Sequence, residues 1–229
     1  MTGTWNVGAV LFDMDGTLLD TERVYFDSLV GAMESFGYTE DVVALCHAMV
    51  GLPGPECEAL LHARYGKDLP LAEISLAYAR RRDETLAAGL PLKRGTVELL
   101  DALQSEQYPM AIVTSSSRRT ADSHLALAGI RDRFETVLTR DDVRRGKPSP
   151  DLYLLAAARF GLDPERCIAV EDSNHGVEAA LAAGAITIMV PDMVPPTEAS
   201  RAKCAAVLPD LGAVREMLQT RCRLARRSS

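Results

Sequence analysis

Short runs of apolar residues recur along the chain, and most of them are continuous instead of alternating with polar residues. The runs lie at 7–12, 110–115, 136–139, 167–170 and 186–190. Continuous apolar runs are typical of strands covered on both faces, as in a parallel sheet between two layers of helices. The segments between them favour helices, which we expect at 95–107, 150–161 and 176–185. This alternation predicts a doubly wound, Rossmann-like α/β fold with a parallel sheet.

One of the expected helices also carries a prediction about burial. In the helix at 95–107, the side chains of Val97, Leu100 and Leu103 recur at a spacing of three residues. Residues three apart lie on the same side of an α-helix. We therefore expect these three side chains to form one apolar face.

The segment 20–92 breaks the alternation because it contains only helical patterns. Four helix-like stretches follow one another, at 22–37, 39–51, 54–66 and 70–89. We therefore expect an inserted four-helix cap domain after the first strand, within an α/β core formed by residues 1–19 and 93–229. Because open α/β sheets bind ligands at the carboxyl ends of their strands, such an insert is placed to act as a lid.

Composition narrows the class of protein. The 229 residues are 47% hydrophobic, enough for a substantial core, and carry a net charge of −7, which argues against a nucleic-acid-binding surface. No apolar run reaches the ~18 residues of a transmembrane helix, and no secretory signal pattern is visible. The five cysteines form no CxxC pair, which favours free thiols. We expect a cytoplasmic, monomeric protein without membrane or nucleic-acid partners.

Two carboxylates, Asp13 and Asp15, follow directly on the first strand in the sequence DMDGT. A turn-capping role would explain either acid alone. Residues two positions apart in an extended chain point the same way, however, and carboxylates held that close repel one another unless a cation lies between them. Oxygen ligands of this kind select Mg²⁺. The pair therefore indicates a magnesium site.

Three further groups follow other predicted strands. The hydroxyls of TSSS at 114–117 precede a helix and could bind an anion, although serine clusters are most often helix caps. Lys147, in GKPSPD, is a cation bracketed by glycine and proline. Glu171 and Asp172 end another apolar strand. Because the carboxyl ends of parallel strands meet at one edge of a sheet, these groups should converge on one crevice.

These stretches resemble, in order and spacing, the four motifs of the haloacid dehalogenase superfamily of phosphohydrolases. The matching sequences are DMDGT, the hydroxyl after AIVT, GKPSPD and VEDSNHG. The resemblance extends from about residue 7 to 218, and is strongest for the branch with β-phosphoglucomutase and sugar-phosphate phosphatases. It implies a Mg²⁺-dependent phosphatase that hydrolyses a small phosphomonoester, most simply a sugar phosphate, through an aspartyl-phosphate intermediate.

The resemblance also implies roles for the acids and the lysine. Asp13 would be the nucleophile that takes the phosphoryl group. Asp15 would act as general acid and then general base. Lys147 would stabilise Asp13 and the transferring phosphoryl group. Mg²⁺ would be held by Asp13, by the backbone carbonyl of Asp15, by Asp172, and by Glu171 directly or through water.

The substrate-binding residues are implied in the same way. Ser115 matches the phosphate-binding hydroxyl, with help from the N–H of Ser116, and Thr114 takes its place if the register shifts by one. Candidate substrate contacts in the expected cap are Glu22, Tyr25 and Gly51.

The reaction is not fixed by the family resemblance alone. In β-phosphoglucomutase a histidine early in the cap and an arginine after a hinge-proximal glycine hold the sugar phosphate. Here Tyr25 and Gly54 stand at the matching positions. The sequence thus favours hydrolysis, with a hexose-phosphate mutase as the alternative. An alternative of another class is a non-catalytic phosphometabolite-binding protein, but such a protein has no need to keep Asp15 and Lys147 together.

Overall fold

The helical insert divides the chain into two units. The computed structural model describes residues 4–50, 52 and 54–224. Residues Met1–Asp20 and Pro91–Ser229 form one unit, here called the core unit, and Thr21–Leu90 form the other, here called the helical unit. All the described strands lie in the core unit, whereas the described elements of the helical unit are helices.

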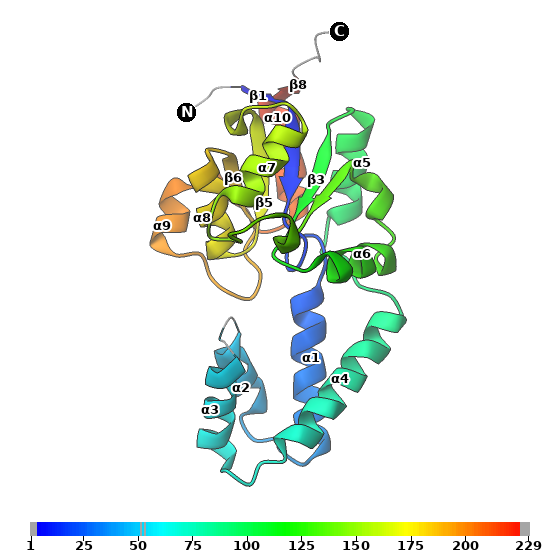
Figure 1. Cartoon of the computed structure of the whole chain (residues 1–229), viewed down its shortest axis with the longest axis vertical. Helices are drawn as coiled ribbons and strands as arrows, with labels where there is room; N and C mark the ends of the chain where they lie inside the picture. The colour runs from blue at the N-terminus through cyan, green and yellow to red at the C-terminus, as the bar shows by residue number, and fades with distance from the viewer. Residues whose placement is uncertain (1–3, 51, 53, 225–229) are drawn as a thin grey trace. The chain divides into compact units, whose positions relative to one another are not determined.

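A six-stranded parallel sheet forms the centre of the core unit (Figure 1). In spatial order its strands are β4 (Thr136–Leu138), β3 (Met110–Val113), β2 (Ala9–Phe12), β5 (Cys167–Glu171), β6 (Ile186–Met189) and β7 (Ala206–Val207). The register aligns Leu11 of β2 with Ala111 on one side and Ala169 on the other. Successive strands are added in opposite directions on the two sides of β2, which makes its carboxyl end the point where such sheets bind ligands.

The first apolar run does not form one strand. β1 (Trp5–Val7) pairs instead with β8 (Cys222–Leu224) in a separate two-stranded parallel sheet, beside which both ends of the described chain lie (Figure 1). The break falls at Gly8, whose N–H donates to the carbonyl of Arg166 at 2.8 Å. A Cβ at this position would lie 2.7 Å from Cδ1 of Leu162. The prediction of a single strand over 7–12 is therefore wrong at its first residues.

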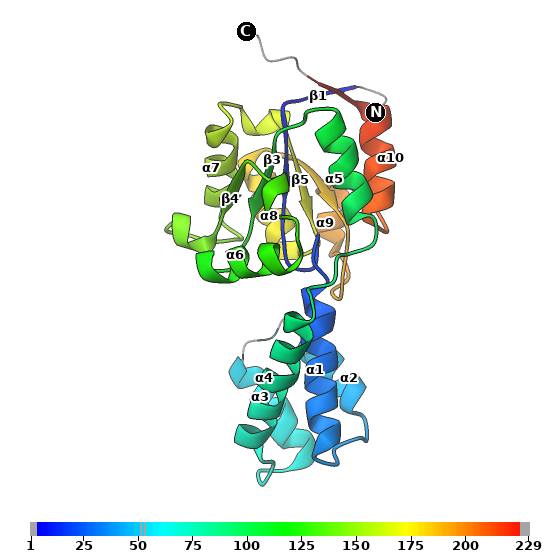
Figure 2. The same cartoon turned by 90° about the vertical axis from the view of Figure 1, so that its right-hand side faces the viewer.

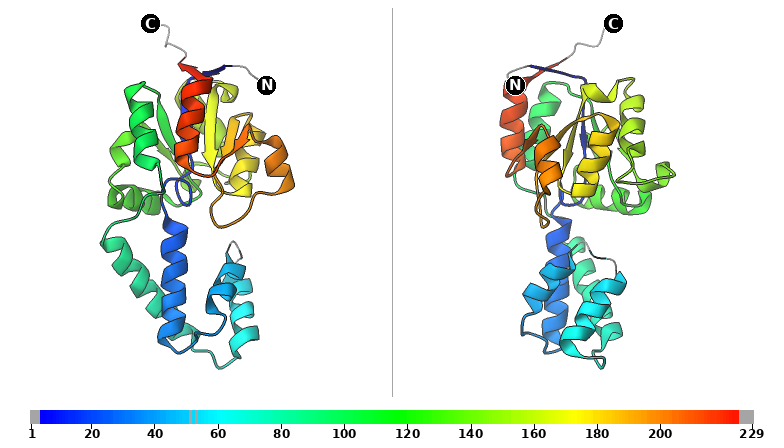
Figure 3. Two further views of the ribbon diagram at one scale, coloured as in Figure 1. Left: turned by 180° about the vertical axis from the view of Figure 1, so that it is seen from behind. Right: turned by 90° about the vertical axis from the view of Figure 1, so that its left-hand side faces the viewer.

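Helices cover both faces of the sheet, which confirms the doubly wound α/β fold. They are α5 (Thr96–Ser105), α6 (Arg118–Leu127), α7 (Asp151–Arg159), α8 (Asn174–Ala183), α9 (Glu198–Lys203) and α10 (Leu211–Arg221). Helices α7 and α8 lie on one face and α5 and α10 on the other (Figures 2 and 3). The core on the α7 side combines alternate strand residues, such as Leu11 and Val113, with Tyr153 and Ala156 of α7. This alternation follows from the two-residue period of strand side chains.

The buried face of α5 differs from the expected one. Leu99, Leu100 and Leu103 are buried together with Thr96, whereas Val97 is 42% exposed. The positions i, i+3, i+4 and i+7 counted from Thr96 form the inward stripe of the helix. The prediction that Val97 shares this face is wrong, because a spacing of three residues alone does not fix which stripe is buried.

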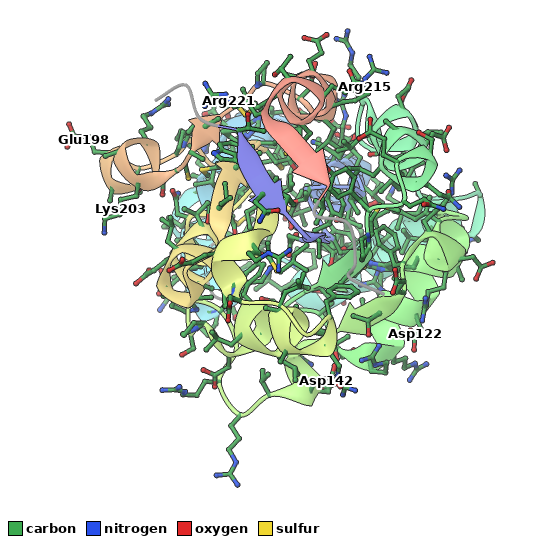
Figure 4. All side chains as sticks on the ribbon, turned by 90° about the horizontal axis from the view of Figure 1, so that it is seen from above. Asp122, Asp142, Glu198, Lys203, Arg215 and Arg221 are labelled. Atoms are coloured by element: carbon green, nitrogen blue, oxygen red, sulfur yellow. The ribbon has the colours of Figure 1, made fainter. Side chains whose placement is uncertain are left out.

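Charged side chains lie around the rim of the core unit. Figure 4 shows Glu198 and Lys203 of α9 projecting outward from the ribbon, and both residues are exposed. Short charged helices of this kind keep polar groups in water while the strands carry the apolar residues.

The helical unit consists of four described helices, α1 (Thr21–Ser35), α2 (Val42–Met49), α3 (Gly54–Tyr65) and α4 (Leu71–Ala87). α1 and α4 pack along one another (Figure 2), and residues such as Met33, Cys46, Leu61 and Ile74 form their own buried cluster. Within the part of the chain that the structure describes, none of the helices has the length and apolar character that a membrane span needs. All five cysteines are free thiols.

The two chain segments at which the helical unit is inserted lie side by side. The N–H of Asp20 donates to the carbonyl of Pro91, and that of Lys93 to the carbonyl of Leu18, both at 2.9 Å. The ammonium group of Lys93 also contacts Asp20 at 3.3 Å and Asp192 at 2.5 Å. At the insertion point the two segments therefore run antiparallel as a short hydrogen-bonded pair. Lys93 adds ion pairs with Asp20 and Asp192.

Candidate active site

Asp13 and Lys147 form the centre of a buried group of charges at the carboxyl end of β2. Asp13 is only 7% exposed, and its N–H continues the sheet by donating to the carbonyl of Val170 at 2.9 Å. Nζ of Lys147 donates to Oδ1 of Asp13 at 2.6 Å, to the carbonyl of Val113 at 2.8 Å and to Oε1 of Glu171 at 2.5 Å. An ammonium group has three protons, so these partners hold Lys147 in one place. The structure thus brings together residues from four separate segments of the sequence.

Burial and charge shift the pKa values of this group strongly. Burial raises the pKa of Asp13 to about 7, against the opposing attraction of Lys147 and with added repulsion from Glu171. Burial also acts to lower the pKa of Lys147, but the charges of Asp13 and Glu171 outweigh it and the pKa is raised. The pKa of Asp172 is raised well above its usual value, first by burial and then by Asp13 and Glu171. For both aspartates, the cost of burial together with repulsion from neighbouring acids exceeds the attraction of Lys147.

The donor atoms of three acids fit a divalent cation. Asp13, Glu171 and Asp172 each offer a carboxylate oxygen, and these oxygens lie within 4.8 Å of one another. Thr17 donates to Oδ1 of Asp172 at 3.1 Å and so fixes its orientation. Gly16 has a φ of +81°, and a Cβ there would lie 2.4 Å from Oδ2 of Asp172. Oxygen donors beside a backbone turn that admits only glycine form a site suited to Mg²⁺.

Glu171 is held by more partners than its place in the sequence suggests. Its Oε1 accepts from Lys147 and from the hydroxyl of Tyr153 at 2.6 Å, and its Oε2 accepts from Ser173 at 3.3 Å. A Cβ at Gly176 would lie 2.0 Å from the carboxyl atoms of Glu171. The start of α8 can therefore approach this carboxylate only because residue 176 is glycine. Glu171 serves as a fixed anchor for Lys147.

Asp15 has partners different from those of Asp13. Oγ of Ser116 donates to its Oδ2 at 2.7 Å, and Nδ1 of His124 lies 3.1 Å from its Oδ1. His124 is 6% exposed and lies on the inner side of α6 with Ala121 and Leu125. Sequence reasoning missed His124. Its position one helical turn after Ala121 marks an inward-facing polar residue, but nothing in the pattern names Asp15 as its partner.

The hydroxyls after β3 are divided among different tasks. Thr114 is buried, and its Oγ1 accepts the N–H of Ser116 at 3.0 Å. Ser115 is exposed. Ser117 caps α6 by accepting the N–H of Thr120 at 3.2 Å. Of the two candidates for a phosphate-binding hydroxyl, Ser115 is therefore the accessible one, and the N–H of Ser116 is already used within the loop.

The remaining candidate residues lie outside the core unit. Glu22 and Tyr25 are on α1 of the helical unit. Gly51 falls outside the residues that the structure describes.

Comparison with known proteins places the chain in a family. Residues 7–184 match the model of the haloacid dehalogenase-like hydrolases. The chain is 35% identical over 179 residues to a phosphorylated carbohydrates phosphatase of Thermotoga maritima, with 77% of this chain and 81% of the relative covered. It is 34% identical over 178 residues to a fructose-1-phosphate phosphatase of Escherichia coli, with 76% and 92% covered.

A solved structure shows the same architecture. The hydrolase of this family from Deinococcus radiodurans R1, crystallised with bound phosphate and sodium, superposes with a TM-score of 0.83 at 28% identity. The match covers 93% of this chain and 96% of that one. With its parallel sheet, its helical insert and the charged group at the end of β2, the chain belongs to the haloacid dehalogenase-like hydrolases.

Proposed function

We propose that this hydrolase is a Mg²⁺-dependent phosphatase that acts on a small phosphomonoester, a sugar phosphate, through a phosphorylated Asp13. It is a phosphoric monoester hydrolase. The observation that carries the proposal is the buried group at the switch point of the sheet, where Lys147 contacts both Asp13 and Glu171 and the oxygens of three acids lie within 4.8 Å. The names of the carbohydrate phosphatase and fructose-1-phosphate phosphatase relatives support the substrate class.

The acids and the lysine divide the work of phosphoryl transfer. Oδ of Asp13 forms a bond to phosphorus as the bond from phosphorus to the leaving oxygen breaks, and Asp15 gives that oxygen its proton. Water then attacks phosphorus, Asp15 takes a proton from it, and Asp13 is released. Lys147 keeps a positive charge beside Asp13 throughout, and the exposed hydroxyl of Ser115 contacts the phosphoryl oxygens.

The metal would be held by Asp13, Asp172 and the backbone carbonyl of Asp15, with Glu171 binding directly or through water. Bound there, Mg²⁺ supplies positive charge that offsets the repulsion between the phosphate and the carboxylates. Burial raises the pKa of Asp13 to about 7, with added repulsion from Glu171 and against the attraction of Lys147. The attraction of Lys147 alone does not offset these effects.

In this proposal the helical unit is the cap that selects the substrate. The boundaries expected from the sequence are 20–92 for the cap and 1–19 with 93–229 for the core, whereas the compact helical unit is Thr21–Leu90. Glu22, Tyr25 and Gly51 are its candidate substrate contacts. Mutase chemistry is less favoured, because the two curated relatives named above are phosphatases.

The proposal is tested by phosphate release from 4-nitrophenyl phosphate and from a panel of sugar phosphates, with Mg²⁺ and with EDTA. We expect activity only with Mg²⁺, and a loss of at least about 10³-fold in Asp13→Asn, as for removal of a nucleophile. Asp101→Asn, an exposed aspartate on α5, is the matched control and should keep full activity. Mass spectrometry after acid quench should find one added phosphoryl group on the wild type and none on Asp13→Asn. Wild-type rates in Asp13→Asn contradict the mechanism, and interconversion of hexose monophosphates without phosphate release indicates a mutase.

A further inference from the structure

We infer that His124 and Ser116 are positioning residues that aim the carboxyl group of Asp15 at the leaving oxygen. The inference rests on the proposed function, in which Asp15 is the general acid and base. It concerns two side chains, the hydroxyl of Ser116 and the ring of His124, that are assigned no contact with the phosphoryl group in the proposed reaction. They act by fixing the orientation of a third.

The contacts of Asp15 come from both sides of its carboxyl group. Ser116 Oγ bonds to Oδ2 at 2.7 Å, and His124 Nδ1 lies 3.1 Å from Oδ1. One partner is in the loop after β3 and the other is one turn before the end of α6. Two bonds to two different oxygens define the plane of the carboxyl group, whereas one bond leaves it able to rotate. The arrangement therefore specifies a direction as well as a position.

Burial makes this arrangement more than an incidental surface contact. The side chain of His124 is 7% exposed and that of Asp15 is 21% exposed. A polar ring buried to this extent needs hydrogen-bond partners, and the tautomer with hydrogen on Nδ1 can donate to Oδ1 of Asp15. Each carboxyl oxygen has two lone pairs, so a hydrogen bond to each still leaves a place for the transferable proton. Asp15 can thus be held and remain able to exchange a proton.

Orientation matters most when the leaving group needs a proton. An alkoxide is a poor leaving group and requires the acid as the bond to phosphorus breaks, whereas 4-nitrophenolate leaves without it. The value of kcat/KM reports only the steps up to departure of the leaving group. Loss of the positioning contacts should therefore lower kcat/KM selectively for a substrate with an alcohol leaving group. A general defect in folding would lower kcat/KM for both kinds of substrate by the same factor.

The test compares 4-nitrophenyl phosphate with 4-nitrobenzyl phosphate, which are similar in size but release a phenol and an alcohol. In the full-length protein with Mg²⁺, His124→Leu removes the contact and His124→Asn restores a donor near the place of Nδ1. Ser116→Ala removes the second contact and Ser116→Thr retains it. Ser105→Ala, an exposed serine on α5, is the matched control. We expect kcat/KM for the benzyl ester to fall about tenfold or more in His124→Leu and Ser116→Ala, and less than about threefold for the phenyl ester, within the 10²–10⁴-fold that a general acid contributes.

The outcomes separate the inference from the function on which it rests. Selective loss with the benzyl ester, and recovery in His124→Asn and Ser116→Thr, supports the inference. Equal losses with both esters, unchanged values, or faster turnover overturn it. If His124→Leu does not fold, Ser116→Ala, with a partly exposed side chain, decides the question. If wild type hydrolyses neither ester, or Asp15→Asn keeps the wild-type selectivity, the proposed function has failed instead.

Discussion

Ion pairs of similar length differ greatly in burial between the two units of this protein. In the core unit, Lys147 lies 2.6 Å from Asp13, and its side chain is 4% exposed. In the helical unit, Arg80 lies 2.9 Å from Glu84, and its side chain is 81% exposed. An exposed pair contributes about 0–1 kcal/mol to stability, whereas a buried pair gains little net stability after the cost of removing its charges from water. Burial, more than distance, therefore distinguishes the pair to which we assign a role in the proposed reaction.

The buried group is also unbalanced, unlike the exposed pair. Lys147 faces Asp13 and Glu171, with Asp172 close by, while Arg80 and Glu84 neutralise each other. An excess of buried acid is costly in the absence of a cation. The excess of acidic groups is therefore a feature by which a candidate cation site can be recognised from the protein alone.

The largest effect should follow from breaking the buried pair. Lys147→Met keeps most of the length of the side chain but leaves two carboxylates without their cation. We expect kcat/KM for 4-nitrophenyl phosphate to fall by about 10²–10³-fold, the usual loss for one charge-stabilising group. Lys67→Met, an exposed lysine of the helical unit, should be fully active. More than a tenth of wild-type activity in Lys147→Met contradicts a role in neutralising charge.

An intermediate effect is expected when the hydroxyl group of a tyrosine is removed, and its size should differ between two tyrosines that each donate one hydrogen bond. The hydroxyl of Tyr153 donates to Glu171 within the buried group, and that of Tyr65 donates to the carbonyl of Glu40 at the surface of the helical unit. Tyr153→Phe should lower the free energy of unfolding by about 1–3 kcal/mol, since a buried charged acceptor loses a donor, and Tyr65→Phe by about 0.5 kcal/mol. Urea denaturation measures both. Equal losses in the two variants would remove the distinction between the regions.

The smallest effect should come from the exposed pair. Arg80→Ala is expected to change the free energy of unfolding by less than about 0.5 kcal/mol, because the pair is solvated and spaced i to i+4 on one helix. Any difference from wild type should shrink in 1 M salt, where the screening length falls to about 3 Å. Denaturation at low and high salt checks this. A salt-independent loss above about 1 kcal/mol means that the pair packs more tightly than its exposure indicates.

The sheet could be predicted from the sequence where burial leaves a visible pattern. β3 is apolar throughout, and β5 and β6 are apolar except for Glu171 at the end of β5 and the buried Thr187 in β6. The break at Gly8 could not be predicted, because β1 pairs with β8 near the other end of the chain. β7 consists of Ala206 and Val207 alone, which is too short to stand out. Local periodicity reports the environment of a strand but not its partner.

The site was predictable to the same extent. Asp13 and Asp172 each follow a strand directly, and parallel strands bring their carboxyl ends together. Lys147 stands out because it lies between a glycine and a proline. His124 lies inside a helix, and its partner Asp15 is 109 positions away, so only the folded chain shows the contact. The choice between Thr114 and Ser115 as the phosphate-binding hydroxyl was also open in the sequence. The burial of Thr114 favours Ser115.

The insertion point carries a consequence for how such proteins diversify. The segments 18–20 and 91–93 are joined by backbone hydrogen bonds, and Lys93 forms an ion pair with Asp192. Since the two ends of the insert are adjacent, a short turn could bridge them without stretching the sheet, and longer or different inserts could be exchanged there. The insert can thus be changed at one place in the chain without moving the charged residues at the carboxyl end of β2.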